Sequence, residues 1–327
     1  MRSSLIQRAA GVALGAVILQ LLMIVAFSWP AARIAPRDVP IVTAGPQAAA
    51  VAGRLDRERP GAFEVTTVAD EAAARAVLAD YEAYGAIVTT PSGPKVLVAS
   101  AASPMVAQLL TQVAQQLSGA PSAAVQDVVA ADADDPRGAG FGALALPLIM
   151  SGIAAAVLLT FAIPALAARA LGLVIFSILG GLGAAWLAQG WLSLLPGSYP
   201  TLASVMGLAV LAVAGTVAGL AAAIGRAGLG LGALTFLLLG NPLSAATSAP
   251  ELLPQPWGEL GQLLPPGAAI TLVRSVTYFD GAGASAPLIT LLAWAAAGLV
   301  LFGVGGLRSR TRTENLAEAE REPAIAS

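Results

Sequence analysis

The sequence predicts a polytopic α-helical membrane protein with six transmembrane helices and a mixed α/β extracytoplasmic domain inserted between helices 1 and 2. Two observations lead to this fold class. Hydrophobic residues make up 57% of the 327 residues and charged residues only 11%, far below the roughly 25% charge of an ordinary soluble domain. The charges are also concentrated in two stretches, one after the first apolar run and one at the C-terminal end. Long uncharged runs, suited to a membrane, therefore alternate with two charged stretches that are suited to water.

The first apolar run, Ala9 to Trp29, is long enough to cross a bilayer as a helix, which takes about 20 residues. It follows Arg2 and Arg8, so a cleaved signal peptide is the alternative interpretation, because such peptides also begin with basic residues. The apolar region of a signal peptide typically spans only about 7 to 15 residues. We therefore expect residues 1–29 to be a cytoplasmic N-terminus followed by a retained transmembrane helix.

Residues 30–137 are expected to form the extracytoplasmic α/β domain, without disulfides because the chain has no cysteine. The pattern predicts the order strand, helix, strand, helix, strand, strand, helix. Asp70 is placed to cap the second helix and Gly85 to stop it, and Ser103-Pro104 begins the last helix. The strands are VPIVT, FEVTTV, GAIVTT and KVLVAS, and the turn sequence PSGP joins the last two in a hairpin.

The acidic stretch ADADDPRG, residues 131–138, ends this domain and allows two interpretations. A calcium site is one of them, but the spacing does not match that of an EF-hand loop. We therefore favour a solvated tether before the second transmembrane helix.

Residues 138–307 are expected to hold the remaining five transmembrane helices. No charge occurs between Arg137 and Arg169 or between Arg169 and Arg226, and LLPGSYP at 194–200 divides the second interval into two spans. The next apolar run, 227–240, ends at Asn241-Pro242, and the last covers about 287–307. Residues 308–327 then form a cytoplasmic tail.

The arginines orient these helices. With the N-terminus in the cytoplasm, seven arginines lie together on the cytoplasmic side, as the positive-inside rule expects; they are Arg2, Arg8, Arg169, Arg226, Arg308, Arg310 and Arg312. An arginine buried in mid-span would cost about 2.5–3.5 kcal/mol, so Arg169 and Arg226 are expected at loops. Abundant alanine and glycine, with arginine preferred to lysine, suggest a GC-rich bacterial genome and hence a bacterial cytoplasmic membrane.

Three small-residue patterns, GVALG at 11–15, GTVAG at 215–219 and GLGLG at 228–232, allow membrane helices to approach closely. In a chain so rich in glycine and alanine, we expect packing within the helical bundle rather than a dedicated dimer face.

The absent residue types exclude several functions. Without cysteine or histidine there is no thiol nucleophile, no histidine proton relay and no ordinary zinc site. There is no GxxxxGK[ST] phosphate loop, and a formal charge of −2 gives no reason to expect nucleic acid. We therefore expect no enzyme and no cofactor in this chain, and a hydrolytic role for Lys95 or Asp280 is a distant alternative.

Two stretches, EAAARAVLADYEAYGAIVTT and NPLSAATSAPELLPQPWGELGQLLPPGAAITLVRSVTYF, give the chain a resemblance to a known family. From Arg2 to about Arg312 it resembles the permease subunits of type-2 ABC exporters and the related phage-infection-protein-like membrane proteins. This resemblance implies one helix, a large extracytoplasmic domain and five further helices. It also implies a homodimer or heterodimer of permeases in membrane lipid and a cytoplasmic ATPase subunit that binds ATP. The absence of charged residues within the spans indicates a lipid-like or amphipathic substrate for such a permease.

The resemblance implies that the segment at about 241–284 enters the membrane part-way from outside and returns, where it caps the outer end of a substrate path. A surface segment is equally compatible with its prolines at 254, 256, 265 and 266. Candidate cap residues are Glu251, Trp257, Glu259 and Arg274, and the glutamates have Arg274, Tyr278 and Asp280 as candidate partners.

Candidate contacts with the ATPase are Arg8 and Arg169. The alternative function is a stand-alone membrane protein whose extracytoplasmic domain binds a partner, an envelope component or a phage.

Overall fold

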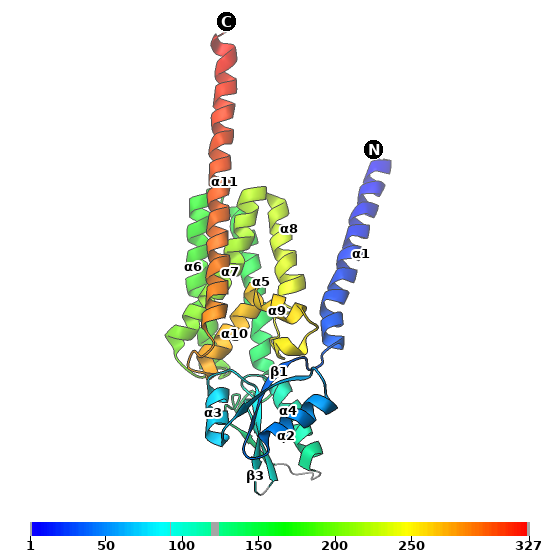
Figure 1. Ribbon diagram of the computed structural model, residues 1–327. Helices are drawn as coiled ribbons and strands as arrows, with labels where there is room; N and C mark the ends of the chain where they lie inside the picture. The colour runs from blue at the N-terminus through cyan, green and yellow to red at the C-terminus, as the bar shows by residue number, and fades with distance from the viewer. Residues whose placement is uncertain (1, 92, 119–123, 326–327) are drawn as a thin grey trace.

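A computed structural model describes residues 2–91, 93–118 and 124–325, which form a bundle of long helices with an α/β domain at one end (Figure 1). The beginning of α1 (Arg2–Ala32) and the end of α11 (Ser285–Ile325) both lie at the end of the bundle away from that domain. The chain therefore descends through α1, builds the α/β domain, and returns to the bundle at α5 (Ala139–Ala162).

The domain contains a five-stranded sheet in the order β2-β1-β3-β4-β5. The first strand pairs in parallel with β2 and β3, β3 and β4 form the expected antiparallel hairpin, and β5 pairs in parallel with β4. The predicted element order is confirmed, and β5 is an addition. Its four residues are all exposed, so they carry no alternation that would mark a strand. The strands are β1 (Val39–Ala44), β2 (Phe63–Val68), β3 (Gly85–Thr90), β4 (Gly93–Val98) and β5 (Ala124–Asp127).

Three helices pack against this sheet, and both predicted N-caps are confirmed. The Asp70 carboxylate accepts a hydrogen bond from the Ala73 amide at 2.9 Å, and the Ser103 hydroxyl accepts one from the Val106 amide at 3.2 Å. The helices are α2 (Ala48–Glu58), α3 (Glu71–Ala79) and α4 (Pro104–Ser118).

The prediction that Gly85 stops the second helix is wrong. That helix, α3, ends at Ala79, and Gly85 is the first residue of β3. A Cβ atom at Gly85 would lie 2.3 Å from Cδ1 of Leu110. The glycine therefore allows α4 to pack closely on the sheet.

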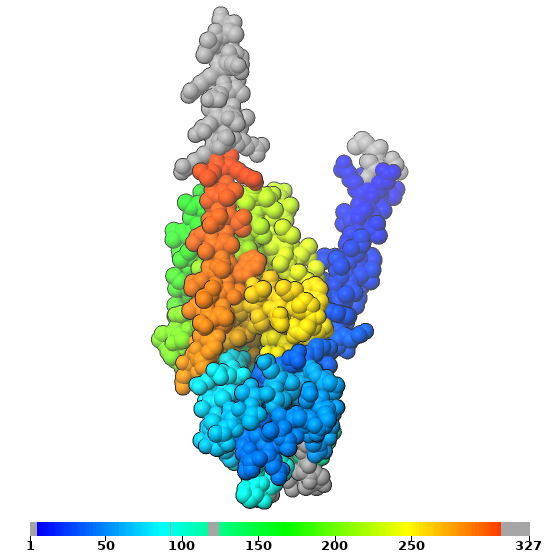
Figure 2. All heavy atoms as spheres, in the orientation of Figure 1, coloured from blue at the N-terminus to red at the C-terminus, as the bar shows by residue number. Residues whose placement is uncertain are grey.

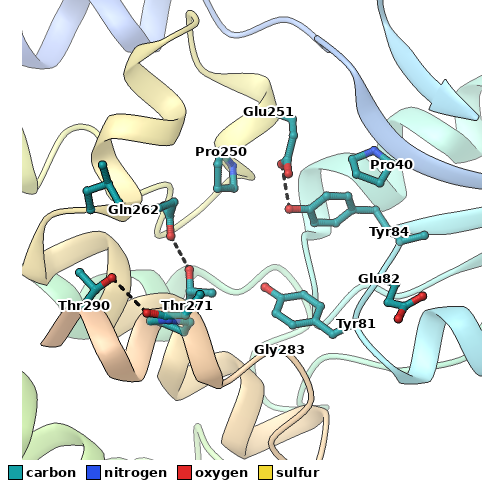
Figure 3. Close-up of a pocket in the computed structure, with 14 residues that line it drawn as sticks. Pro40, Tyr81, Glu82, Tyr84, Pro250, Glu251, Gln262, Thr271, Gly283 and Thr290 are labelled. Atoms are coloured by element: carbon teal, nitrogen blue, oxygen red, sulfur yellow. Dashed lines mark hydrogen bonds between the residues drawn. The ribbon is translucent and has the colours of Figure 1, made fainter. Parts of the chain in front are cut away.

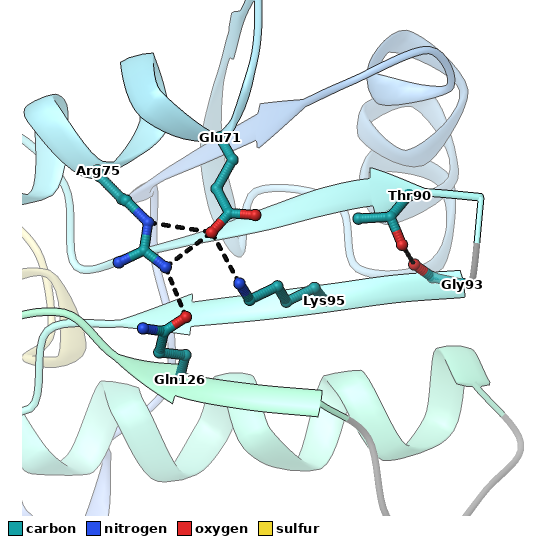
Figure 4. A network of polar contacts seen from close by, with 6 residues as sticks. All are labelled: Glu71, Arg75, Thr90, Gly93, Lys95 and Gln126. Carbon is teal, nitrogen blue, oxygen red and sulfur yellow. Dashed lines mark hydrogen bonds and ion pairs between the residues drawn. The ribbon is translucent and has the colours of Figure 1, made fainter.

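A polar network joins α3 to the far edge of the sheet (Figure 4). One Glu71 carboxylate oxygen lies 2.7 Å from Nη2 of Arg75 and 2.7 Å from Nζ of Lys95 on β4. The Arg75 guanidinium also donates to the Gln126 side chain on β5. Hydrogen bonds from Lys95 and then Arg75 lower the pKa of Glu71. Lys95 thus has a structural ion pair that crosses from strand to helix.

Among the residues that the structure describes, five helices are long and apolar enough to cross a membrane, so a largely helical fold that is compatible with membrane spans and carries a small mixed sheet is observed. The expected count of six spans is not confirmed. The five are the apolar parts of α1, α5, α6 (Leu166–Ala185) with the π-helical η1 (Trp186–Trp191), α7 (Tyr199–Ile224) and α11.

The expected fifth span is shorter than the others. It consists of α8 (Arg226–Leu234) and the π-helical η2 (Thr235–Gly240). Gly225, with a φ of 78°, starts it, and Asn241 follows its end. At about 1.5 Å per residue it reaches roughly 22 Å, less than the roughly 30 Å of a hydrocarbon core.

The central helix of the bundle is α7, which packs against α5, α6, α8, α10 (Pro265–Tyr278) and α11. Two of the small-residue patterns lie at these contacts. A Cβ at Gly219 would be 2.6 Å from the Gly298 carbonyl oxygen on α11, and one at Gly228 would be 2.3 Å from the Leu220 carbonyl oxygen. Gly11 and Gly15 on α1, in contrast, have no such neighbour within 4 Å.

Helix α1 stands apart from the bundle along most of its length (Figures 1 and 2). Its apolar surface is exposed, and its contact with the rest of the chain lies near its C-terminal end. There the Trp29 ring meets the Trp257 ring edge to face, with centroids 6.3 Å apart.

Residues 241–284, called the proline-rich segment below, lie between the bundle and the α/β domain (Figure 1). As expected from its prolines, it forms short pieces instead of one helix: η3 (Pro250–Leu252), α9 (Trp257–Gln262) and α10. These pieces position the site described next.

Candidate functional site

Backbone hydrogen bonds attach the α/β domain to the proline-rich segment. The Ala35 amide donates to the Leu252 carbonyl at 3.0 Å, and the Arg37 amide donates to the Glu251 carbonyl at 3.1 Å. The Arg37 guanidinium also donates to the Leu252 carbonyl at 3.0 Å. The stretch that leads from α1 into β1 is therefore held against η3 by main-chain contacts.

The hydrophobic core of the α/β domain extends into the same segment. Ala249, Leu252 and Phe279 are buried in one cluster with the residues of the sheet. The Tyr81 ring, in the loop after α3, stacks on the Phe279 ring with centroids 4.2 Å apart and planes at 16°. Because the two parts share a core, their relative position is defined by packing as well as by hydrogen bonds.

The contact region between the α/β domain and the proline-rich segment is called the junction below. A tyrosine and a glutamate connect the two sides at its centre. The Tyr84 hydroxyl donates to a Glu251 carboxylate oxygen at 2.9 Å (Figure 3). Tyr84 is only 8% exposed, and burial raises the pKa of its hydroxyl well above the usual range. Burial also raises the pKa of Glu251, opposed by its own backbone amide, by Tyr84 and by the charge of Arg274.

A cavity of about 360 Å³ lies beside this pair, between the α/β domain, the proline-rich segment and the first turn of α11 (Figure 3). A volume of this size falls in the range of small-molecule sites, about 300–1,000 Å³. Its wall is mainly apolar. The apolar side chains include Pro40, Pro250, Leu263 and Pro287.

The polar groups of the wall come from both sides of the cavity. Tyr81, Glu82 and Tyr84 belong to the domain, and Glu251 and Gln262 belong to the proline-rich segment. Thr271 and Thr290 add hydroxyl groups from α10 and α11. The Thr271 hydroxyl donates to the Gln262 amide oxygen at 2.6 Å, which orients that side chain (Figure 3).

The four candidate cap residues occupy different surroundings. Glu251 lines the cavity, whereas Glu259 lies exposed on α9 and Trp257 contacts Trp29. Arg274 is 3% exposed; its guanidinium donates to the Ala246 carbonyl at 3.1 Å and lies 5.0 Å from the Phe141 ring centroid. Within the described residues, Arg274 forms no ion pair with either glutamate.

The other two candidate partners of the glutamates also lie elsewhere. The Tyr278 hydroxyl donates to the Leu194 carbonyl at 3.3 Å, and burial, with the charges of Asp132 and Asp135, raises its pKa to about 12. Asp280 is exposed, with a φ of 51°.

The acidic stretch before α5 has a structural role in this region. The Asp135 carboxylate accepts a hydrogen bond from the Phe141 amide at 2.7 Å, at the beginning of α5. A carboxylate is favourable there because the first amides of a helix lack partners within it.

The candidate ATPase contacts differ from each other in exposure. Arg8 lies exposed on α1. Arg169 is 7% exposed, and its guanidinium donates to the carbonyls of Ile163 at 2.9 Å and Thr160 at 3.3 Å. Arg169 therefore satisfies the free carbonyls at the C-terminal end of α5.

Sequence reasoning missed Tyr84 as a site residue. It lies 167 positions from Glu251, and no local periodicity relates residues that far apart. A tyrosine directly before a buried strand was the available signal. Comparison with protein families, with curated proteins and with solved structures finds no match to this chain.

Proposed function

We propose that the chain is the membrane-spanning permease subunit of an ABC-type exporter that moves a lipid-like or amphipathic substrate with a separate ATPase. The α/β domain lies on the extracytoplasmic side of a bacterial cytoplasmic membrane, and the proline-rich segment forms the outer end of the path. The observation that carries this proposal is the cavity at the junction, which is walled by the domain, the proline-rich segment and α11 together. A relative movement of these parts would change its shape.

The arginines support this orientation. Arg226 lies 5.6 Å from the Phe161 ring centroid, and the Arg308 guanidinium donates to the Ala223 carbonyl at 2.6 Å. Together with the contact of Arg169 to Ile163, these contacts collect three cations at one end of the bundle. That end is away from the α/β domain, so the positive-inside rule assigns it to the cytoplasm.

The test is affinity purification of the full chain from native membranes in mild detergent. We expect an ATP-hydrolysing subunit to co-purify in a fixed ratio, and its ATP hydrolysis to respond to amphipathic compounds. An untagged strain is the control for non-specific capture. Reproducible absence of an ATPase would contradict the proposal.

The second candidate is a stand-alone membrane protein whose domain binds an envelope component or a phage. It is favoured by short connections at the end of the bundle that holds Arg169, Arg226 and Arg308. These connections are residues 163–165 between α5 and α6 and Gly225 between α7 and α8. Such connections offer a small surface to a cytoplasmic subunit. Purification without an ATPase, together with capture of an extracytoplasmic component, would support this candidate.

A further inference from the structure

The cavity at the junction has an unequal distribution of charge. Among the described residues that line it, Glu82 and Glu251 are acidic and none is lysine or arginine. Its remaining polar groups are hydroxyls and one amide, which suit many head groups. The carboxylates are the groups of the wall that distinguish ligands by charge.

Glu251 is the carboxylate most affected by its surroundings. Its side chain lines the cavity and receives a hydrogen bond from Tyr84, and burial is the main influence on its pKa. No described lysine or arginine lies within ion-pair distance of it. A partly buried carboxylate without a counter-charge is less favourable than an exposed one, because it has lost part of its solvation by water.

Arg274 does not supply that counter-charge directly. Its field lowers the pKa of Glu251, but burial has the larger and opposite effect. The guanidinium is held by the Ala246 carbonyl and the Phe141 ring, and Arg274 is not part of the cavity wall. The part of the chain that the structure describes therefore places no cation against Glu251, and a ligand in the cavity is positioned to supply one.

The rest of the wall is suited to an apolar body. Pro40, Pro250 and Pro287 present rigid rings, and Leu263 adds an aliphatic side chain. Such surfaces bind alkyl groups because contact removes apolar area from water or from the membrane surface.

We propose that this cavity binds a cationic amphiphile, a molecule of the alkylamine type whose ammonium group contacts the Glu251 carboxylate and whose apolar part contacts the proline-rich wall. This inference rests on the proposed function in that it names the head group of the amphipathic substrate. An ammonium group at hydrogen-bond distance also favours the ionised form of the carboxyl, which opposes the effect of burial.

The test uses the full chain in phosphatidylcholine nanodiscs, without any ATPase. A photoreactive diazirine analogue of dodecylamine labels the protein, and unlabelled dodecylamine, dodecanol and dodecanoate compete with it. We expect dodecylamine to compete at a concentration at least about tenfold below that of dodecanol, because a charged hydrogen bond is stronger than a neutral one. Dodecanoate should compete more weakly than dodecanol.

Two variants separate the carboxylate from general apolar binding. Glu251→Gln keeps the size of the side chain and an acceptor for Tyr84, and it should abolish the preference for the amine over the alcohol. Glu259→Gln is the matched control, because Glu259 is exposed on the same segment and does not line the cavity. Equal competition by amine and alcohol in the wild type, or an unchanged preference in Glu251→Gln, would overturn the inference.

Peptide mapping of the label keeps the test decisive even if Glu251→Gln folds poorly. In the wild type the label should map to residues 81–84, 250–263 or 283–290. Label confined to the groove between α6 and α7, which includes Ser177 and Tyr199, would contradict the inference. The binding test contains no ATPase, so its outcome does not depend on co-purification. Amine binding can fail although an ATPase co-purifies, and amine binding can succeed although no ATPase co-purifies. The two proposals are therefore tested separately.

Discussion

The hydroxyl of Tyr84 donates a hydrogen bond of 2.9 Å to the carboxylate of Glu251, and this bond joins the α/β domain to the segment that closes one end of the helical bundle. Around it the Tyr81 ring stacks on Phe279, and the backbone of residues 35–37 is hydrogen-bonded to η3. The bond is thus one of several contacts that hold the domain in place, and it is the one that involves a partly buried carboxyl.

Removal of the Tyr84 hydroxyl should weaken this junction. In Tyr84→Phe the ring remains and the Glu251 carboxylate loses a donor, so we expect a loss of about 1–3 kcal/mol in the free energy of unfolding. Hydrogen exchange of residues 33–37 and 249–253 should increase. Tyr81→Phe is the control, because it keeps the stack on Phe279 and removes a hydroxyl that has no hydrogen bond within the described structure. Equal effects of the two variants would contradict this role for Tyr84.

The raised pKa of Glu251 predicts a pH dependence of stability. A carboxyl whose pKa is higher in the folded chain than its ordinary value of 4.5 binds its proton more tightly when folded. Its contribution to stability is therefore fully present below pH 4.5 and is lost as pH rises through the folded value.

In thermal unfolding, the wild type should lose more stability than Glu251→Gln as the pH rises from 4.5 towards neutrality. Glu71 has the opposite sign, because its pKa is lowered and its contribution is lost as pH falls. As the pH falls, Glu71→Gln should therefore lose less stability than the wild type. Parallel pH curves for the wild type and Glu251→Gln would show that burial of this carboxyl is without effect.

The contact between α6 and α7 depends on the absence of a side chain at Gly181. A Cβ there would lie 2.4 Å from the Ala203 carbonyl oxygen and 2.6 Å from the Gly207 amide nitrogen. Gly181→Ala should force the helices apart and destabilise the bundle by about 1–3 kcal/mol. Gly183→Ala is the control on the same helix, since its Cβ would meet nothing within 4 Å. Unfolding in mixed detergents measures both, and a neutral Gly181→Ala would contradict the close approach.

Arg169 should be more important for stability than an exposed arginine. Arg169→Gln removes the guanidinium that binds the Ile163 and Thr160 carbonyls at the end of α5, so we expect a loss of about 1.5–3 kcal/mol. Arg8→Gln, at an exposed position of α1, should leave the melting temperature unchanged. If instead Arg169→Gln unfolds like the wild type, the buried hydrogen bonds contribute little, and a role in binding a partner becomes the stronger explanation.

The orientation in the membrane can be tested cleanly because the chain has no cysteine. Asp56→Cys places a thiol on the exposed side of α2, and Ile224→Cys places one at the opposite end of the bundle, where Ile224 is 50% exposed. In intact spheroplasts a membrane-impermeant maleimide should label the first variant and spare the second. Permeabilised cells should label both. The reverse pattern in intact spheroplasts would invert the proposed topology.

Features that depend on neighbours along the chain were predictable from the sequence. The caps at Asp70 and Ser103, the order of elements from β1 to α4, and the long apolar helices all follow from residues a few positions apart, because local hydrogen bonds and hydropathy determine them. The prolines of the segment at 241–284 likewise predicted that it would not form one continuous helix.

Other features depend on contacts between segments that are distant in the sequence, and only the tertiary structure decided them. Gly85 was expected to end a helix and instead makes room for Leu110, and Arg274 was a candidate partner of the glutamates and instead binds Ala246 beside Phe141. The pairing of Tyr84 with Glu251 spans 167 positions. Residue type and spacing determined the helices and strands from β1 to α4 and the long apolar helices. Side-chain packing between the α/β domain and the proline-rich segment decided which polar groups meet at the cavity, because burial energies depend on the neighbours that the fold supplies.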